Sequence, residues 1–226
     1  MTVAGNWPRA LLFDLDGTLV DSAPDLRDAL NETLAERGIA PFDIEDVHTL
    51  VGGGVAVLIE RALSRRNREF GEADKAEITD RFVELYEPRA TRLTRLLDGA
   101  AEALAASRAH GAKVALVTNK PTAPALAILE HFDIADQFDL VVGGDAGPPK
   151  KPAPDLLLHA AAELGVQVTE CLFVGDSEND VNAAKTAGMP VAALKGGYTA
   201  LSIESLDPTY PLENLGELPA LFAPVT

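Results

Sequence analysis

The sequence predicts an α/β fold whose core is a doubly wound parallel sheet, with an all-helical segment inserted after the first strand. Two observations carry this prediction. Between residues 113 and 194, short apolar runs alternate with helical patterns, which is typical of βαβ units and a parallel sheet. Between Pro24 and Leu96 only helical patterns occur. The helical segment is therefore best explained as an insertion between the first strand and the rest of the sheet.

The N-terminal part is expected to contain one strand and four helices. Residues 10–13 are apolar and are followed directly by turn residues, as in a buried strand. The first helix, from Ala23 towards Gly38, repeats leucine at every fourth position, which indicates one buried face. Further helices are expected over 44–50, 55–65 and 73–96, the last with a kink at Pro88.

The C-terminal part is expected to supply the remaining strands and their connecting helices. The predicted strands are 113–117, 138–142, 172–174 and 190–194. The predicted helices are 121–132, 154–164 and 179–187. Residues 197–226 show little periodicity, so we expect a loop and a short closing helix there.

Composition narrows the classes of function. The chain of 226 residues is 47% hydrophobic and carries 35 acidic against 19 basic residues, a net charge of −16. This charge argues against binding nucleic acid or an anionic membrane surface. Cys171 is the only cysteine, so no intramolecular disulfide can form. With no signal peptide and no apolar run near the ~20 residues of a membrane span, we expect a cytoplasmic protein.

The first predicted strand ends in the sequence Asp14-Leu15-Asp16-Gly17-Thr18. Two carboxylates at the end of a strand can converge on one divalent cation. Mg²⁺ prefers a few carboxylate or carbonyl oxygens and keeps the rest of its shell for water and phosphate. An ordinary aspartate-rich turn is the alternative interpretation of these residues alone.

Two further strands also end in polar residues suited to phosphate chemistry. Thr118 and Asn119 follow one strand, and Asp176 follows another, with Asp180 four residues later. The carboxyl ends of parallel strands lie along one edge of a sheet, where ligands bind. The pair Lys150-Lys151 lies before Pro152 in a loop that can bring an ammonium group to the same edge. These segments are therefore expected to meet in one cleft.

Together these four segments resemble the four motifs of the haloacid dehalogenase superfamily. They match D-x-D-x-T, Thr-Asn, Lys-Pro and G-D-S-x-x-D in that order, over residues 10–195. The inserted helical segment is similar in place and character to the four-helix cap of that superfamily. Within it, the run from Phe13 to Ser22 and the run from Gly52 to Leu63 look most like those of phosphoglycolate phosphatases. The resemblance implies a Rossmann-like core over 1–20 and 97–226 and a cap over 21–96.

The resemblance also implies a role for each motif residue. Asp14 would attack phosphorus and form an aspartyl-phosphate, and Asp16 would be the general acid and then the base for water. Mg²⁺ would be held by the side chains of Asp14 and Asp176 and by the backbone carbonyl of Asp16. The transferring phosphoryl group would be bound by Thr118, Asn119 and Lys151, and Asp180 would hold Lys151 or a metal-bound water.

The cap is expected to close over the site and to supply specificity. Gly52, Gly53 and Gly54 precede a helix, and free N–H groups at a helix start favour an anion. We hypothesise that Gly53 with its neighbours, together with Arg61, meets the substrate carboxylate. The alternative is a loop that needs glycine only for its backbone angles.

The function implied is a Mg²⁺-dependent phosphomonoesterase that hydrolyses 2-phosphoglycolate to glycolate and phosphate. Other phosphatases and phosphomutases acting on a small phosphorylated metabolite, such as a sugar phosphate or pyrophosphate, share the same chemical residues and stay open as alternatives. The expected partner is therefore a small phosphorylated metabolite, and the expected assembly is a monomer or homodimer.

Overall fold

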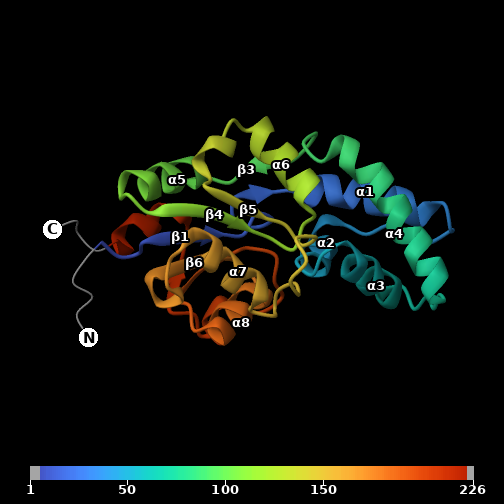
Figure 1. The fold of residues 1–226 in the computed structure, drawn as a ribbon. Helices are drawn as coiled ribbons and strands as arrows, with labels where there is room; N and C mark the ends of the chain where they lie inside the picture. Colours follow the sequence, from blue (N-terminus) through green and yellow to red (C-terminus); the bar gives the residue numbers. More distant parts are fainter. Residues whose placement is uncertain (1–5, 223–226) are drawn as a thin grey trace.

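One parallel sheet organises the core. The computed structural model describes residues 6–222, so the first five and last four residues of the expected core lie outside the described part. Six strands lie in the order β5-β4-β1-β6-β7-β8, and every neighbouring pair is parallel (Figure 1). This confirms the doubly wound α/β fold. The strands are β1 (Ala10–Phe13), β4 (Lys113–Val117), β5 (Leu140–Val142), β6 (Cys171–Gly175), β7 (Val191–Leu194) and β8 (Tyr210–Leu212).

Helices cover both faces of this sheet. Leu11 and Phe13 of β1 pack in a cluster with α5 and α6, whereas Ala10 and Leu12 pack in a second cluster with α7 and α8. Figure 1 shows these two pairs of helices on opposite sides of the sheet. A strand covered on both faces must be apolar throughout, which explains why β1 shows no polar alternation. The helices are α5 (Ala100–Ala109), α6 (Thr122–His131), α7 (Asp155–Leu164) and α8 (Glu178–Ala187).

The inserted segment begins and ends at a small antiparallel pair, β2 (Val20–Asp21) with β3 (Arg95–Leu96). Between these strands, four helices pack around a hydrophobic cluster of their own, at the opposite end of the molecule from α5 (Figure 1). They are α1 (Ala23–Ala35), α2 (Ile44–Leu50), α3 (Val55–Arg65) and α4 (Glu72–Tyr86). The strand pair brings both ends of the insertion together.

The last helix of the insertion is shorter than the sequence predicts. It ends at Tyr86, and a single 3-10 turn, Glu87–Arg89, follows it. The predicted kink at Pro88 is wrong, because the helix has already ended there. Proline has no N–H to donate to a continuing helix, so it is suited to a position just after the last turn. The chain then turns back towards α1, so residues up to Leu96 form a turn and a strand instead of helix.

Two elements of the core were not expected. Strand β8 extends the sheet by one edge strand within the region predicted as loop. Its Pro211 explains the weak strand signal, because proline is tolerated only at sheet edges and strand ends. Helix α5 is rich in alanine, a strong helix former, but lacks a distinct apolar stripe in its sequence.

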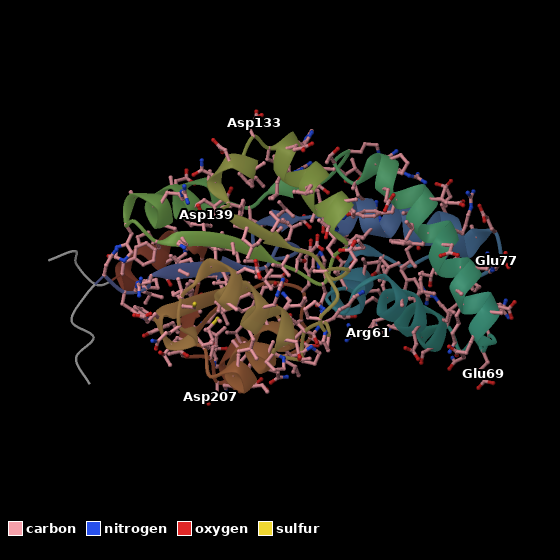
Figure 2. The ribbon with its side chains drawn as sticks, viewed as in Figure 1. Arg61, Glu69, Glu77, Asp133, Asp139 and Asp207 are labelled. Carbon is pink, nitrogen blue, oxygen red and sulfur yellow. The ribbon has the colours of Figure 1, made fainter. Side chains whose placement is uncertain are left out.

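The negative charge lies largely on the outer surface. Exposed acidic residues project from the cap and the core alike (Figure 2). Examples labelled there are Glu69, Glu77, Asp133 and Asp207. Among residues 6–222, no helix is both long and apolar enough to cross a membrane.

Asp25 anchors the return of the chain from the cap, and its removal should destabilise the protein. Its side chain is fully buried, and Oδ2 accepts hydrogen bonds of 2.8 Å from the backbone N–H groups of Leu93 and Thr94. Asp25→Ala leaves these donors without their acceptor. We expect the free energy of unfolding, measured by urea denaturation, to fall by about 2–4 kcal/mol.

Asp74→Ala is the matched control, because Asp74 is an exposed aspartate in the first turn of α4. We expect it to change the free energy of unfolding by less than about 0.5 kcal/mol. Equal effects of the two substitutions would contradict the anchoring role of Asp25.

Candidate active site

Neighbouring strands deliver the site residues to one edge of the sheet. β1 lies between β4 and β6, with Phe13 paired to Leu116 on one side and to Val174 on the other. Because the three strands are parallel and in register, their ends lie side by side. Asp14, Thr118 and Asp176 follow these ends directly, so the expected convergence of the three segments is present.

Lys151 links two of the carboxylates at this edge. Its Nζ atom lies 2.9 Å from Oδ1 of Asp14 and donates a 2.7 Å hydrogen bond to Oδ1 of Asp180. It also donates to the carbonyl of Val117 at 3.0 Å. The side chain of Lys151 is 1% exposed, so water does not reach its ammonium group. The three oxygens take the place of that water as hydrogen-bond acceptors. The expected contact between Asp180 and Lys151 is therefore found.

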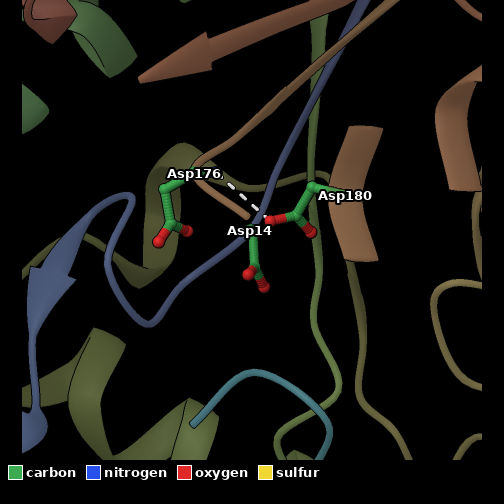
Figure 3. Close-up of side chains that lie close together, drawn as sticks. All are labelled: Asp14, Asp176 and Asp180. Carbon is green, nitrogen blue, oxygen red and sulfur yellow. Dashed lines mark hydrogen bonds between the residues drawn. The ribbon is translucent and has the colours of Figure 1, made fainter. Parts of the chain in front are cut away.

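Asp14, Asp176 and Asp180 form a buried acidic cluster. One carboxylate oxygen from each lies within 4.8 Å of the others (Figure 3). Asp176 accepts hydrogen bonds from Thr18 Oγ1 at 2.9 Å and from the N–H of Tyr198 at 2.6 Å. Asp180 also caps α8, because its Oδ2 accepts from Ser177 N and Oγ.

The electrostatics of this cluster suit a bound cation. Burial raises the pKa of Asp14 to about 6, against the opposing charge of Lys151. Burial also raises the pKa of Asp176 well above its usual value, and the charges of Asp180 and Asp14 add to the shift. Three carboxylates face one ammonium, so ionising all of them leaves negative charge that a divalent cation would compensate. Clustered carboxylate oxygens are the donors that Mg²⁺ prefers, so these residues fit the metal.

Asp16 lies outside this cluster and contacts a different lysine. Its Oδ1 accepts a 2.5 Å hydrogen bond from Ser22 Oγ. Lys120 donates from Nζ to both carboxylate oxygens of Asp16, at 3.0 and 3.2 Å. The Asp16 side chain is thus separate from the two carboxylates expected to hold the metal. Sequence reasoning assigned no role to Lys120, and its only signal was its place directly after Thr118-Asn119.

The side chain of Asn119 holds the loop that carries Lys151 through hydrogen bonds to its backbone. Its Oδ1 accepts from the N–H of Lys151 at 2.9 Å, and its Nδ2 donates to the carbonyls of Lys151 and Gly52, each at 2.8 Å. The side chain therefore joins the core to the cap. Neighbouring Thr118 is buried, and its hydroxyl accepts from the N–H of Lys120 at 3.2 Å.

A small cavity opens between these residues and the cap. Its volume is about 50 Å³. A single water needs roughly 10–15 Å³ by the same measure, so the cavity suits a small ligand. The core side of its lining is Asp14, Asp16, Thr118, Asn119, Lys120, Pro121 and Pro124. The cap side is mostly apolar: Leu26, Val51, Gly52, Gly54, Val55, Leu58, Val83, Tyr86 and Glu87.

Two residues expected to meet the substrate carboxylate are not part of this lining. Gly53 is absent from the lining, and a Cβ atom there would stand 2.6 Å from the Val57 side chain of α3. Arg61, which lies on α3 (Figure 2), donates to the carbonyls of Leu50 and Val51 at 3.2 and 3.0 Å. Gly52 and Gly54 do line the cavity, with positive φ angles of 101° and 87°.

An acidic cluster and a lysine at the carboxyl edge of a parallel sheet, roofed by inserted helices, define a hydrolase of the haloacid dehalogenase type. The chain belongs to the haloacid dehalogenase-like hydrolases, whose family model matches residues 8–188.

The curated relatives carry a more specific name. The chain is 43% identical to a phosphoglycolate phosphatase of Cereibacter sphaeroides over 211 residues, covering 93% of this chain and 96% of the relative. It is 42% identical to a phosphoglycolate phosphatase of Rhodospirillum rubrum, covering 88% and 84% of the two chains. A crystal structure titled as a predicted phosphoglycolate phosphatase from Haemophilus somnus 129pt is similar at a TM-score of 0.87 and 32% identity, covering 93% and 96%. The resemblance inferred from the motifs is thereby confirmed.

The charge of the acidic cluster should lower the stability of the protein when no metal ion is bound. Because the pKa of the buried Asp176 carboxyl is raised, its ionised form destabilises the folded wild type, most strongly at alkaline pH. Asp176→Asn removes that charge. At pH 8 without divalent cations, we expect the variant to melt higher than the wild type, by about 2–4 °C per kcal/mol relieved. The difference should shrink as the pH falls, because the wild-type carboxyl then takes up a proton.

Added Mg²⁺ should raise the melting temperature of the wild type by mass action and leave Asp176→Asn nearly unchanged. Asp133→Asn is the control, because Asp133 is exposed and its φ of 54° suits asparagine. An equal Mg²⁺ response in all three proteins would show that the cluster is not the metal site.

Proposed function

We propose that this hydrolase is a Mg²⁺-dependent phosphomonoesterase that converts 2-phosphoglycolate and water to glycolate and phosphate. The observation that carries the proposal is the Asp14 carboxylate, which lines a cavity fit for a small ligand and lies 2.9 Å from the Lys151 ammonium. The shared name of the relatives supports the substrate.

The side chains of Asp14 and Asp176 and the backbone carbonyl of Asp16 would hold Mg²⁺. When bound, the ion would supply positive charge to the phosphoryl oxygens. The buried cluster of Asp14, Asp176 and Asp180 supports this assignment, because its negative charge exceeds that of Lys151. Asp180 then acts on the site indirectly, by positioning Lys151 at 2.7 Å.

Asp14 is the nucleophile in the first step. A carboxylate oxygen of Asp14 forms a bond to phosphorus, the bond from phosphorus to the ester oxygen breaks, and an aspartyl-phosphate results. Phosphoryl transfer depends mainly on alignment and charge compensation, so a weak nucleophile suffices. Lys151, the Thr118 hydroxyl and the N–H of Asn119 compensate the charge of the phosphoryl oxygens.

Asp16 moves the protons. It gives a proton to the leaving oxygen of glycolate in the first step, and then takes one from the water that attacks the aspartyl-phosphate. Its position supports two roles in sequence, since its carboxylate lines the cavity without joining the acidic cluster. Hydrogen bonds from Ser22 and Lys120 hold the carboxylate in place.

We infer that residues 1–20 and 97–226 are the catalytic core and that residues 21–96 form the cap, which excludes water from the cavity. The β2–β3 pair at both boundaries and the separate hydrophobic cluster of the cap support this division. A cytoplasmic location and a monomeric or homodimeric state stay predictions from the sequence.

The substrate is tested by phosphate release in the presence and absence of Mg²⁺. We expect kcat/KM for 2-phosphoglycolate to exceed that for p-nitrophenyl phosphate, pyrophosphate and glucose 1-phosphate by at least ~100-fold, or about 2.7 kcal/mol. Asp14→Asn should abolish release, and Asp133→Asn should leave it unchanged. A flat profile would refute the substrate, and return of phosphate to a sugar product would indicate a mutase.

Asp16→Asn separates the two chemical steps. With p-nitrophenyl phosphate the leaving group needs little protonation, so the first step continues while hydrolysis of the aspartyl-phosphate stalls. We expect a rapid burst of p-nitrophenol of about one equivalent per site, followed by turnover at least ~100-fold below the wild type. Unchanged steady turnover would contradict the role of Asp16.

A further inference from the structure

One lysine that lines the cavity has so far only the role of holding the Asp16 carboxylate. Lys120 is the only basic residue among the described residues that line the cavity, and its side chain is 4% exposed. The acidic lining residues are Asp14, Asp16 and Glu87, of which Glu87 is exposed. Lys120 therefore provides the positive charge that faces the rest of the cavity, since Lys151 contacts Asp14 and is assigned to the phosphoryl group.

A tyrosine of the cap faces the same ammonium. The Nζ atom of Lys120 lies 4.7 Å from the ring centroid of Tyr86, within the range of a cation–π contact. Tyr86 also lines the cavity, and its buried hydroxyl lies beside the Lys120 ammonium and donates to no acceptor among the described residues. Burial raises the pKa of Tyr86 to about 12, so the hydroxyl keeps its proton near neutral pH and can donate it. Buried donors normally have an acceptor, and a carboxylate oxygen of a ligand would supply one here.

Lys120 lies close to the place where the ester oxygen of a small phosphate ester must bind. The ester oxygen must lie within hydrogen-bond reach of Asp16, which protonates it. Lys120 is 3.0 and 3.2 Å from the two oxygens of Asp16, so its ammonium lies next to that position. In 2-phosphoglycolate the carboxylate carbon is two bonds from the ester oxygen. A carboxylate this close to the ester oxygen would therefore be within reach of the Lys120 ammonium.

We propose that the Lys120 ammonium and the Tyr86 hydroxyl bind the carboxylate of the substrate and make the site selective for phosphate esters with a carboxylate on the ester carbon. This assignment rests on the proposed function and deepens it. It replaces the hypothesis that Gly53 and Arg61 bind the carboxylate, because neither lines the cavity. Core and cap each supply one group, so selection requires both to lie as they do in this structure.

Binding without chemistry tests the assignment directly. The ligand 3-phosphonopropionate matches 2-phosphoglycolate with a methylene in place of the ester oxygen, and propylphosphonate has a methyl group in place of its carboxylate. With Mg²⁺ present, calorimetry should show tighter binding of 3-phosphonopropionate to the wild type. In Lys120→Met we expect its Kd to rise at least ~30-fold, or about 2 kcal/mol, while the Kd of propylphosphonate changes less than ~3-fold.

Three further variants sharpen the result. Tyr86→Phe keeps the ring and should weaken 3-phosphonopropionate selectively, by about 5- to 10-fold, the scale of one neutral hydrogen bond. Lys120→Arg should restore most of the selectivity. Lys150→Met is the matched control, because exposed Lys150 lies close to the cap loop at Gly54 yet does not line the cavity. It should leave the ratio of the two Kd values unchanged.

Hydrolysis gives the second readout. In Lys120→Met we expect kcat/KM for 2-phosphoglycolate to fall at least ~30-fold further than kcat/KM for ethyl phosphate, chiefly through KM. An equal fall for both esters, with an unchanged ratio of phosphonate Kd values, would overturn the proposal and make Lys120 a positioning residue for Asp16. If the wild type does not prefer 2-phosphoglycolate, the proposed function fails, and the phosphonate pair still decides the role of Lys120.

Discussion

The site depends on one buried ammonium. Lys151 lies between Asp14 and Asp180, and a lysine with almost no exposure is tolerable only with such partners. These contacts depend in turn on other residues. The Asp180 carboxylate is held at the first turn of α8 by the N–H of Ser177, and the N–H of Lys151 is held by Asn119. The nucleophile is thus positioned by elements separated by more than a hundred residues.

A second set of contacts ties the cap to this centre. The Tyr198 hydroxyl donates to Asp21 at 2.6 Å and accepts from the N–H of Ala23 at 2.9 Å, while its own N–H donates to Asp176. Asn119 reaches the cap carbonyl of Gly52 from the opposite side of the cleft. The entry into the cap is therefore bonded to residues that also hold the acidic cluster and the Lys151 loop.

Local patterns predicted most of the elements and missed those that depend on distant partners. The apolar run of β1 and the leucine repeat of α1 were sufficient for their assignment, because burial on a sheet or along a helix imposes a period. The continuation of α4 past Tyr86 was wrong, since the turn there is held by Asp25, far away in the sequence. Strand β8 was missed because an edge strand with a proline carries little pattern.

The sequence alone determined the family, the order of the strands' polar ends and the residues expected to carry the chemistry. Those follow from motif spacing and from the rule that parallel strands end along one edge. Only the tertiary structure decided which groups face the cavity. Lys120 reaches it from the segment after β4 and Tyr86 from the end of α4, whereas Gly53 and Arg61 do not line it. The direction of a side chain is set by packing between core and cap, which no local pattern encodes.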